Sequence, residues 1–564
     1  MTARAVPDRL IGQGEAVSPP GRFDRWHPWL PHVLAILAVA VACALAIRAT
    51  HALTCPPESD HYRDAGTAQA ILDGSMGKDV AYRGAPQWYP PLIPALAAVT
   101  SYVTSESPLA VYARYGTYLN LAVPVAFYLL GFCLFGAWPA FFALVGYLFV
   151  GNWSGPTSGQ ASYSPWMWPF VTAQAFTFAT AACWLRALRT HRFCWDIATA
   201  ILLGLTFLAH PTAALILALS MATLTVAKAF RSPKSSREHR WRSLAIIAAI
   251  SLTIASSYLV PLITSYHLTV VNVVPNRFVG LWGRQILAAQ TTWRTAGALL
   301  GLFAIWRLRS QRGALRAESA GAVTTLTAVA AFLFAYGFVV QELEPYGIQL
   351  PLPVPAFHFH YYLTAFEALL FGVGFWYGLP LIARAVSTRL PSVSATNLRF
   401  KPAVLLILLV ALAIAHLRGY LDRDDLVHWP AQARMLEANR VRGNLYRWAR
   451  TQLSDHDVVL TDDFYGLFAV IAAGRHVVTA DLAMVSPYVD AEQRRRDRIA
   501  MFESLCGQAS TTSAAVFARY GVTYVTALPS REKLGCSADR MARSNIPLVY
   551  RSGQLAIFSV PRAP

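Results

Sequence analysis

The sequence predicts an α-helical polytopic membrane protein with about eleven transmembrane helices, followed by a soluble C-terminal α/β domain. Composition is the first indication. Of the 564 residues, 55% are hydrophobic and only 14% are charged, whereas about 25% of a soluble domain is charged. The second indication is that apolar runs of about 18 or more residues recur along the chain, and each is long enough to cross a hydrocarbon core of about 30 Å.

Eleven segments have the composition of a transmembrane helix. The first lacks the small-residue cleavage site of a signal peptide, so we expect it to be retained. The eighth is the shortest. In chain order, the predicted spans are 30–50, 115–135, 137–152, 168–186, 195–211, 212–228, 243–263, 295–306, 321–340, 363–383 and 402–417.

Basic residues indicate which ends of the spans face the cytoplasm. Every second connecting segment is rich in Arg and Lys, while the loops between them contain far fewer. Cytoplasmic loops carry this excess, so the N-terminus is predicted inside and residues 418–564 outside. The net charge of +18 is explained in this way and does not indicate nucleic acid as a partner. We therefore expect a multi-pass protein of the bacterial inner membrane.

This topology divides the chain into three parts: a cytoplasmic segment 1–29, a transmembrane domain 30–417 and an extracytoplasmic domain 418–564. The large outer loops of the transmembrane domain are 51–114, 264–294 and 341–362. Within the first of these loops, the apolar stretch Pro91–Thr104 is too short to span easily. It predicts an interfacial or re-entrant helix, which must bury its backbone against protein.

The tail combines short β-type runs with helical stretches, which is typical of a small α/β domain. The expected strands are 458–461, 476–480, 520–527, 548–551 and 555–560, and the last two flank a hairpin signal at Ser552-Gly553-Gln554. No GxGxxG motif follows a strand, so nothing marks a nucleotide site. Cys506 and Cys536 are expected to form a disulfide in an oxidising compartment. Two free thiols, or a bond to Cys55, are the alternatives.

Five titratable residues follow directly after the first span: Glu58, Asp60, His61, Arg63 and Asp64. A carboxylate that is covered near a membrane surface can have a perturbed pKa and act as a general base. The alternatives are solvated loop charges, or the cap and first turn of a helix that runs to Leu72. Asp60 could serve both as cap and as catalyst.

The order of several short motifs resembles the GT-C superfamily of glycosyltransferases. Ser59-Asp-His-Tyr62 follows the first span, a helix then runs to Gly74, and Tyr89-Pro-Pro-Leu92 comes next. Further matching segments are Ala113-Arg114, Leu208-Ala-His-Pro-Thr212, Tyr520–Val525, Pro547–Tyr550 and Ala556–Val560. Each motif is short, and the specific feature is their order along most of the chain.

Members of this superfamily are multi-pass enzymes that take a sugar from a polyprenyl-phosphate carrier. The resemblance implies that Asp60 is the catalytic base, which activates the acceptor as it attacks the anomeric carbon. Segment Asn152–Pro169 has no Asp or Glu, although several branches have a second acidic residue there. This departure argues against metal dependence and against the oligosaccharyltransferase branch. Trp88-Tyr89 stands where the aminoarabinose branch has a Lys, which argues against that branch.

Other polar residues near the predicted outer interface are candidates for binding the donor or acceptor. Arg277 and Arg284 have the fork geometry that suits phosphate, although they could be interfacial anchors. Glu367 is ionisable within a span and is therefore a functional candidate, unless it only pairs with a Tyr, Ser or Thr hydroxyl nearby. The complete set of binding candidates is Glu58, His61, Arg63, Asp64, Tyr89, His210, Arg277, Arg284, His358, His360 and Glu367.

For His210, His358 and His360, a structural role is the alternative. No metal ligands are predicted, and a divalent metal ion stays an open alternative. The sequence thus predicts an inverting GT-C-type enzyme with a polyprenyl-phosphate-linked sugar donor. Its acceptor would be an extracytoplasmic glycan, lipid or protein, and membrane lipids would surround it. A transporter and a non-catalytic membrane scaffold are the alternatives, although no internal repeat typical of transporters is found.

A reporter enzyme that works only outside the cytoplasm should be active when it is fused after Val560. It should be inactive when fused after Ser235, because that loop is among the most basic segments of the chain. Reporter activity measured in intact cells checks the topology, and the reverse pattern would refute the span count.

Overall fold

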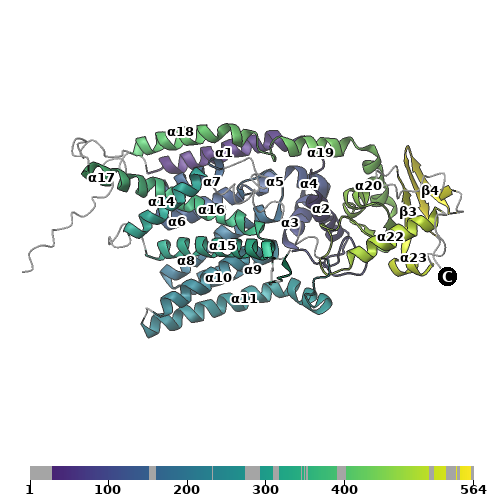
Figure 1. The fold of residues 1–564 in the computed structure, drawn as a ribbon, viewed down its shortest axis with the longest axis horizontal. Helices are drawn as coiled ribbons and strands as arrows, with labels where there is room; N and C mark the ends of the chain where they lie inside the picture. The colour runs from purple at the N-terminus through teal and green to yellow at the C-terminus, as the bar shows by residue number, and fades with distance from the viewer. Residues whose placement is uncertain are drawn as a thin grey trace, which may run out of the picture.

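The fold is an elongated molecule with a helical bundle at one end and a small sheet at the other (Figure 1). Helices of the first outer loop lie between these two parts. The computed structural model describes residues 28–151, 161–230, 233–272, 292–308, 317–343, 346–348, 350, 354–389, 402–506, 514–528, 541–542 and 546–560.

Each of the eleven predicted spans coincides with a helix in the bundle. In chain order these helices are α1 (Leu30–Thr50), α5 and α6 (Gly116–Leu119 and Ala122–Phe135), α7 (Ala137–Phe149), α8 (Pro169–Thr190), α9 (Phe193–Ala209), α10 (Pro211–Ala229), α11 (Lys234–Tyr266), α14 (Trp293–Leu308), α15 (Ala317–Leu343), α16 (Phe357–Val373) and α18 (Pro402–Leu421). Among the described residues, seven helical segments are long and apolar enough to cross a membrane. The predicted fold class is therefore confirmed: the protein is a polytopic, α-helical membrane protein.

Side-chain contacts gather the alternate loops at opposite ends of the bundle. At one end, Tyr266 at the close of α11 donates a hydrogen bond to the carbonyl of Pro86 in the first loop, at 2.7 Å. At the other end, Arg189 of α8 bonds to Ser319 of α15 at 2.6 Å. This arrangement agrees with the predicted alternation of loops. Which end faces the cytoplasm stays a prediction.

Small residues let α16 pack closely against α14. A Cβ atom built on Gly297 or Gly301 of α14 would come closer than 3.0 Å to Phe371 or Leu370 of α16. A π-helical turn over Gly374–Gly378, followed by α17 (Leu379–Arg389), continues α16. In lipid, such close approach is a main source of helix association. This close packing fixes the position of α16, whose N-terminal turns carry several candidate residues.

The tail folds as predicted into strands and helices. The five-stranded sheet has the order β2-β1-β3-β5-β4, with β2 and β3 parallel to β1, and β5 antiparallel to both β3 and β4. Its strands are β1 (Val458–Leu460), β2 (His476–Val477), β3 (Val522–Ala527), β4 (Leu548–Ser552) and β5 (Leu555–Ser559). Gly553, with φ of 57°, makes the turn of the predicted hairpin.

Helices cover this sheet and connect it to the bundle. They are α19 (His428–Ala438), α20 (Arg440–Gln452), α21 (Asp463–Tyr465), α22 (Ala491–Leu505) and α23 (Ala514–Tyr520), with a π-helical turn over Gly466–Ile471. Cys506 is disulfide-bonded, whereas Cys55 is buried and free. Cys536, the expected partner of Cys506, lies outside the described residues.

The first outer loop shares one hydrophobic core with the tail. The loop contains α2 (Ser59–Leu72), α3 (Leu92–Thr104) and α4 (Pro108–Arg114). Tyr62 and Ala65 of α2 are fully buried in the same cluster as Leu445 of α20 and Val470. The predicted interfacial or re-entrant segment is α3, which buries one face against α2 and exposes Val99, Tyr102 and Val103 on the other.

A buried ion pair joins the end of the bundle to the tail. Arg423 and Asp425 follow α18, and their side chains are 1% and 0% exposed. Two hydrogen bonds, of 2.9 and 2.6 Å, connect them. Arg423 also bonds to the carbonyl of Tyr163, and Trp166 bonds to the carbonyl of Asp425. The pair therefore fixes the segment that leads into α8.

Replacing Arg423 by Leu should lower the free energy of unfolding by about 3–5 kcal/mol, because it leaves the Asp425 carboxylate buried without its cation. Thermal unfolding in detergent measures this loss. Arg418→Leu is the matched control, since Arg418 pairs with Asp422 at 3.7 Å while 96% exposed. Equal melting of the two variants would contradict a structural role for the buried pair.

Candidate active site

The candidate site begins at the N-terminus of α2. Pro56 and Pro57 restrict the preceding backbone, and Glu58 is the extended N-cap residue, with φ of −104° and no capping hydrogen bond from its side chain. Asp60 lies in the first helical turn, where a negative charge interacts favourably with the helix dipole. The cap is thus Glu58, while Asp60 remains free to make other contacts.

Arg63 joins the two aspartates of this helix. Its guanidinium contacts a carboxylate oxygen of Asp60 at 2.9 Å and one of Asp64 at 2.9 Å. It also lies over the Tyr89 ring, 3.7 Å from the ring centre. The side chain of Asp64 is 1% exposed, whereas that of Asp60 is 34% exposed. Of the two carboxylates, only Asp60 can therefore reach a ligand from solvent.

Burial changes the proton affinity of the neighbouring acids. It raises the pKa of Glu58 to about 6, and the charge of Asp60 adds to this effect. Burial likewise raises the pKa of Asp64, although Arg63 opposes the change. The three acids therefore lie in different environments. Of the two that contact Arg63, Asp60 is the more accessible.

His61 points into a set of aromatic rings. It is fully buried, its ring centre lies 4.0 Å from that of Trp168, and the rings of Tyr112 and Trp166 are about 6 Å away. Neither ring nitrogen has a hydrogen-bond partner among the described residues. Burial, followed by the charge of Arg63, lowers the pKa of His61 to about 3. The histidine is thus neutral and packed against rings.

The bundle contributes a second group of rings beside α2. His210 at the start of α10 lies 5.0 Å from His358 of α16, measured between ring centres. The hydroxyl of Tyr362 is 3.5 Å from Nδ1 of His210. Tyr361 stacks on Phe170 at 4.3 Å and is close enough to Asp60 for an electrostatic interaction. Tyr361 and Tyr362 are site residues that sequence reasoning missed, although they adjoin the predicted histidines.

The two histidines of α16 do not share a site. His358 lies beside His210, whereas His360 contacts the Phe334 ring at 6.2 Å and interacts with Arg294. Their sequence alternates with aromatics as a strand would, but the segment is helical. Residues two apart on a helix point in nearly opposite directions.

Glu367 has an ionic partner that the sequence did not suggest. Arg294, in the first turn of α14, lies 3.7 Å from Glu367, and both side chains are at most 10% exposed. The hydroxyl of Thr295 is 3.4 Å from the same carboxylate oxygen. The expected Ser or Thr partner on a neighbouring span is therefore present, together with a cation that the sequence assigned to a loop. The sequence does contain a signal for such a cation, because a charged side chain inside a span requires an opposite charge nearby.

Arg277 and Arg284, the predicted phosphate-binding arginines, lie outside the described residues. Within the described parts of the chain, no three His, Cys, Asp or Glu side chains gather as they would to hold a metal ion.

Glu58→Gln should remove a pH dependence of stability. Because burial raises the pKa of Glu58 from 4.5 to about 6, its contribution to stability is fully present below pH 4.5 and is lost as the pH rises through 6. The wild-type protein should thus lose up to about 2 kcal/mol relative to Glu58→Gln over this range. Melting curves between pH 4.5 and 7.5 measure it, with Glu492→Gln, on the exposed face of α22, as the control. Parallel curves for wild type and Glu58→Gln would contradict it.

Comparison with known proteins gives the wider context of this site. No protein-family model matches the sequence, and no curated protein sequence matches it. Solved structures do match. ArnT from Cupriavidus metallidurans in the apo state aligns with a TM-score of 0.54 at 12% identity, over 94% of this chain and 98% of that chain.

Two other glycosyltransferases align equally well. The apo oligosaccharyltransferase of Archaeoglobus fulgidus gives a TM-score of 0.53 at 11% identity, over 88% of this chain and 69% of that chain. The arabinofuranosyltransferase AftD from Mycobacteria gives 0.53 at 12% identity, over 96% of this chain but only 40% of that chain. These three belong to the superfamily that the motif order resembles. The chain therefore has the fold of the GT-C superfamily of polyprenyl-phosphate-dependent glycosyltransferases.

Proposed function

We propose that this protein is a membrane glycosyltransferase that moves a sugar from a polyprenyl-phosphate donor to an extracytoplasmic acceptor. The observation that carries the proposal is the partly exposed carboxylate of Asp60, held by Arg63 at the start of α2 and close to Tyr361 of the bundle. The GT-C fold supports it. Similar solved structures include ArnT bound to undecaprenyl phosphate and the archaeal oligosaccharyltransferase AglB in complex with a dolichol-phosphate.

In this mechanism Asp60 is the general base. Its carboxylate takes the proton from the acceptor hydroxyl or amide as that group attacks the anomeric carbon. The bond from that carbon to the lipid phosphate breaks, and the phosphate leaves with the bonding electrons. Attack from the face opposite the phosphate inverts the anomeric centre. Arg63 holds the carboxylate in place through their ion pair at 2.9 Å.

The lipid phosphate would bind on the bundle side of Asp60. Arg277 and Arg284, which lie in the sequence between α11 and α14, are the proposed cations, because a guanidinium can bind phosphate in a bidentate manner. His210 and His358 lie together at the outer end of α10 and α16 and are the proposed contacts to the sugar or phosphate. The acceptor would be a cell-wall or surface glycan, a lipid or a protein, in the compartment outside the bacterial inner membrane.

Asp60→Asn and Asp60→Ala should each lower kcat by at least about 100-fold, because they remove the general base. Melting should change little, since Asp64 still neutralises Arg63. Transfer of a labelled sugar from a polyprenyl-phosphate donor measures the effect. Asp422→Asn is the control, because Asp422 is exposed and is predicted to lie on the same side of the membrane as Asp60. Full activity of both Asp60 variants would reject Asp60 as the base, whereas no transfer by the wild-type protein would favour the transporter or scaffold alternatives.

A further inference from the structure

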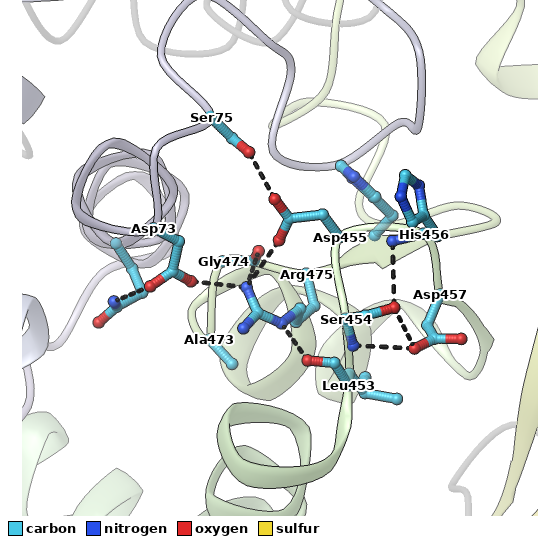
Figure 2. A network of polar contacts seen from close by, with 12 residues as sticks. Asp73, Ser75, Leu453, Ser454, Asp455, His456, Asp457, Ala473, Gly474 and Arg475 are labelled. Carbon is cyan, nitrogen blue, oxygen red and sulfur yellow. Dashed lines mark hydrogen bonds and ion pairs between the residues drawn. The ribbon is translucent and has the colours of Figure 1, made fainter.

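The C-terminal end of α2 is held by arginines of the tail. Asp73, which caps this end, accepts hydrogen bonds of 2.7 Å from both Arg450 of α20 and Arg475 before β2. Figure 2 shows Arg475 between the carboxylates of Asp73 and Asp455. Asp455 in turn accepts a hydrogen bond of 2.6 Å from Ser75. Two acids from distant segments thus contact one cation, and Ser75 holds one of them.

This position is unusual for an acid, and that makes the arginines necessary. A negative charge at the C-terminus of a helix is disfavoured by the helix dipole. Burial also raises the pKa of Asp73, but its bonds to Arg450 and Arg475 outweigh these effects and hold the pKa below its usual value. Arg475 is itself 8% exposed and donates further bonds to the carbonyls of Leu453 and Gly474. Its position is therefore determined by the tail backbone.

The middle of α2 is in direct contact with the tail backbone. A Cβ atom on Gly66 would lie closer than 3.0 Å to the carbonyl of Ile471. Real Cβ atoms essentially never approach a backbone atom so closely. Gly66 is therefore needed for the helix to lie where it does, and any larger residue must move α2 away from the tail.

The segment that enters α2 is held by a third contact. Glu437 of α19 accepts hydrogen bonds from the backbone and hydroxyl of Thr54, and Gln432 donates a bond of 3.1 Å to the carbonyl of Pro57. Contacts before, within and after α2 thus all come from residues beyond α18. A helix of 14 residues is rigid, about 20 Å long, so fixing these points also fixes its first turn.

We propose that the tail is a positioning element for the Asp60 carboxylate, acting through Arg475 at Asp73 and through the close contact at Gly66. The inference rests on the proposed role of Asp60 and extends it to residues that touch no substrate. The tail would then be part of the catalytic unit. A misplacement of about 1 Å at a reacting group can cost about 100-fold in rate, so these contacts should affect turnover.

The first test is kinetic. Arg475→Ala should lower kcat per folded enzyme by about 10- to 100-fold without raising the KM for a polyprenyl-phosphate sugar. Arg475→Lys should recover part of this loss, because a lysine keeps one charged bond to Asp73. Arg496→Ala is the matched control, since Arg496 is exposed on α22 and donates a hydrogen bond to Gln493 of the same helix. A loss confined to the yield of folded protein, with wild-type kcat, would overturn the inference.

The second test removes no charge. Gly66→Ala should reduce kcat in the same way, whereas Gly443→Ala should not, because a Cβ on Gly443 in the first turn of α20 meets nothing within 4 Å. Hydrogen exchange, followed by mass spectrometry, gives a readout independent of catalysis. Exchange in α2 should become faster in Arg475→Ala and Gly66→Ala and stay as in wild type in both controls.

The two readouts separate the possible failures. Wild-type exchange in α2 and wild-type kcat in Arg475→Ala and Gly66→Ala would overturn the positioning role. Faster exchange in α2 of these variants, combined with no transfer by wild type from any polyprenyl-phosphate sugar, would support the positioning of α2 and reject the proposed function.

Discussion

The close contact of α2 with the Ile471 carbonyl is the constraint on which the candidate site depends. It requires a glycine at position 66, and it brings the helix that carries Asp60 into the core of the tail. The other side of the site comes from α16, which is itself fixed by glycines of α14. The candidate site therefore lies between a helix of the bundle and a helix that the tail holds in place.

Several buried arginines follow one electrostatic rule. A buried guanidinium is tolerated when carboxylates and carbonyls surround it, and Arg63, Arg294, Arg423 and Arg475 each have a carboxylate within 4 Å. In the Arg294 and Arg423 groups that carboxylate is at most 10% exposed. Asp60 beside Arg63 is 34% exposed, and Asp455 beside Arg475 is 38% exposed. Exposure therefore leaves two accessible acids, and the interaction with Tyr361 of the bundle favours Asp60 as the place of the proposed chemistry.

The parts of the fold that depend on local physics could be predicted from the sequence. A span needs enough apolar residues to cross the bilayer, so each of the eleven predicted segments coincides with a helix. The five strands were also predicted, because β-type runs and the Gly553 turn are local signals. The resemblance to the GT-C superfamily was correct at the level of the fold.

The parts that depend on distant contacts could not be predicted. His358 and His360 were both binding candidates, and their sequence could not show that helical geometry sends them to different neighbours. Arg294 was assigned to a loop, because its partner Glu367 is not adjacent in sequence. The arginines that hold Asp73 lie 377 and 402 residues from it, and no periodicity connects them. The role of Asp60 and the binding residues stay predictions.

The separation of Asp73 and Arg475 has a consequence for biosynthesis. The two residues are 402 positions apart, and at about 5–20 residues per second the ribosome needs roughly 20–80 s to make the intervening chain. During that time α2 has left the ribosome without the domain against which Tyr62 and Ala65 pack. The helix that carries Asp60 can thus reach its final position only after nearly the whole chain has been translated and inserted.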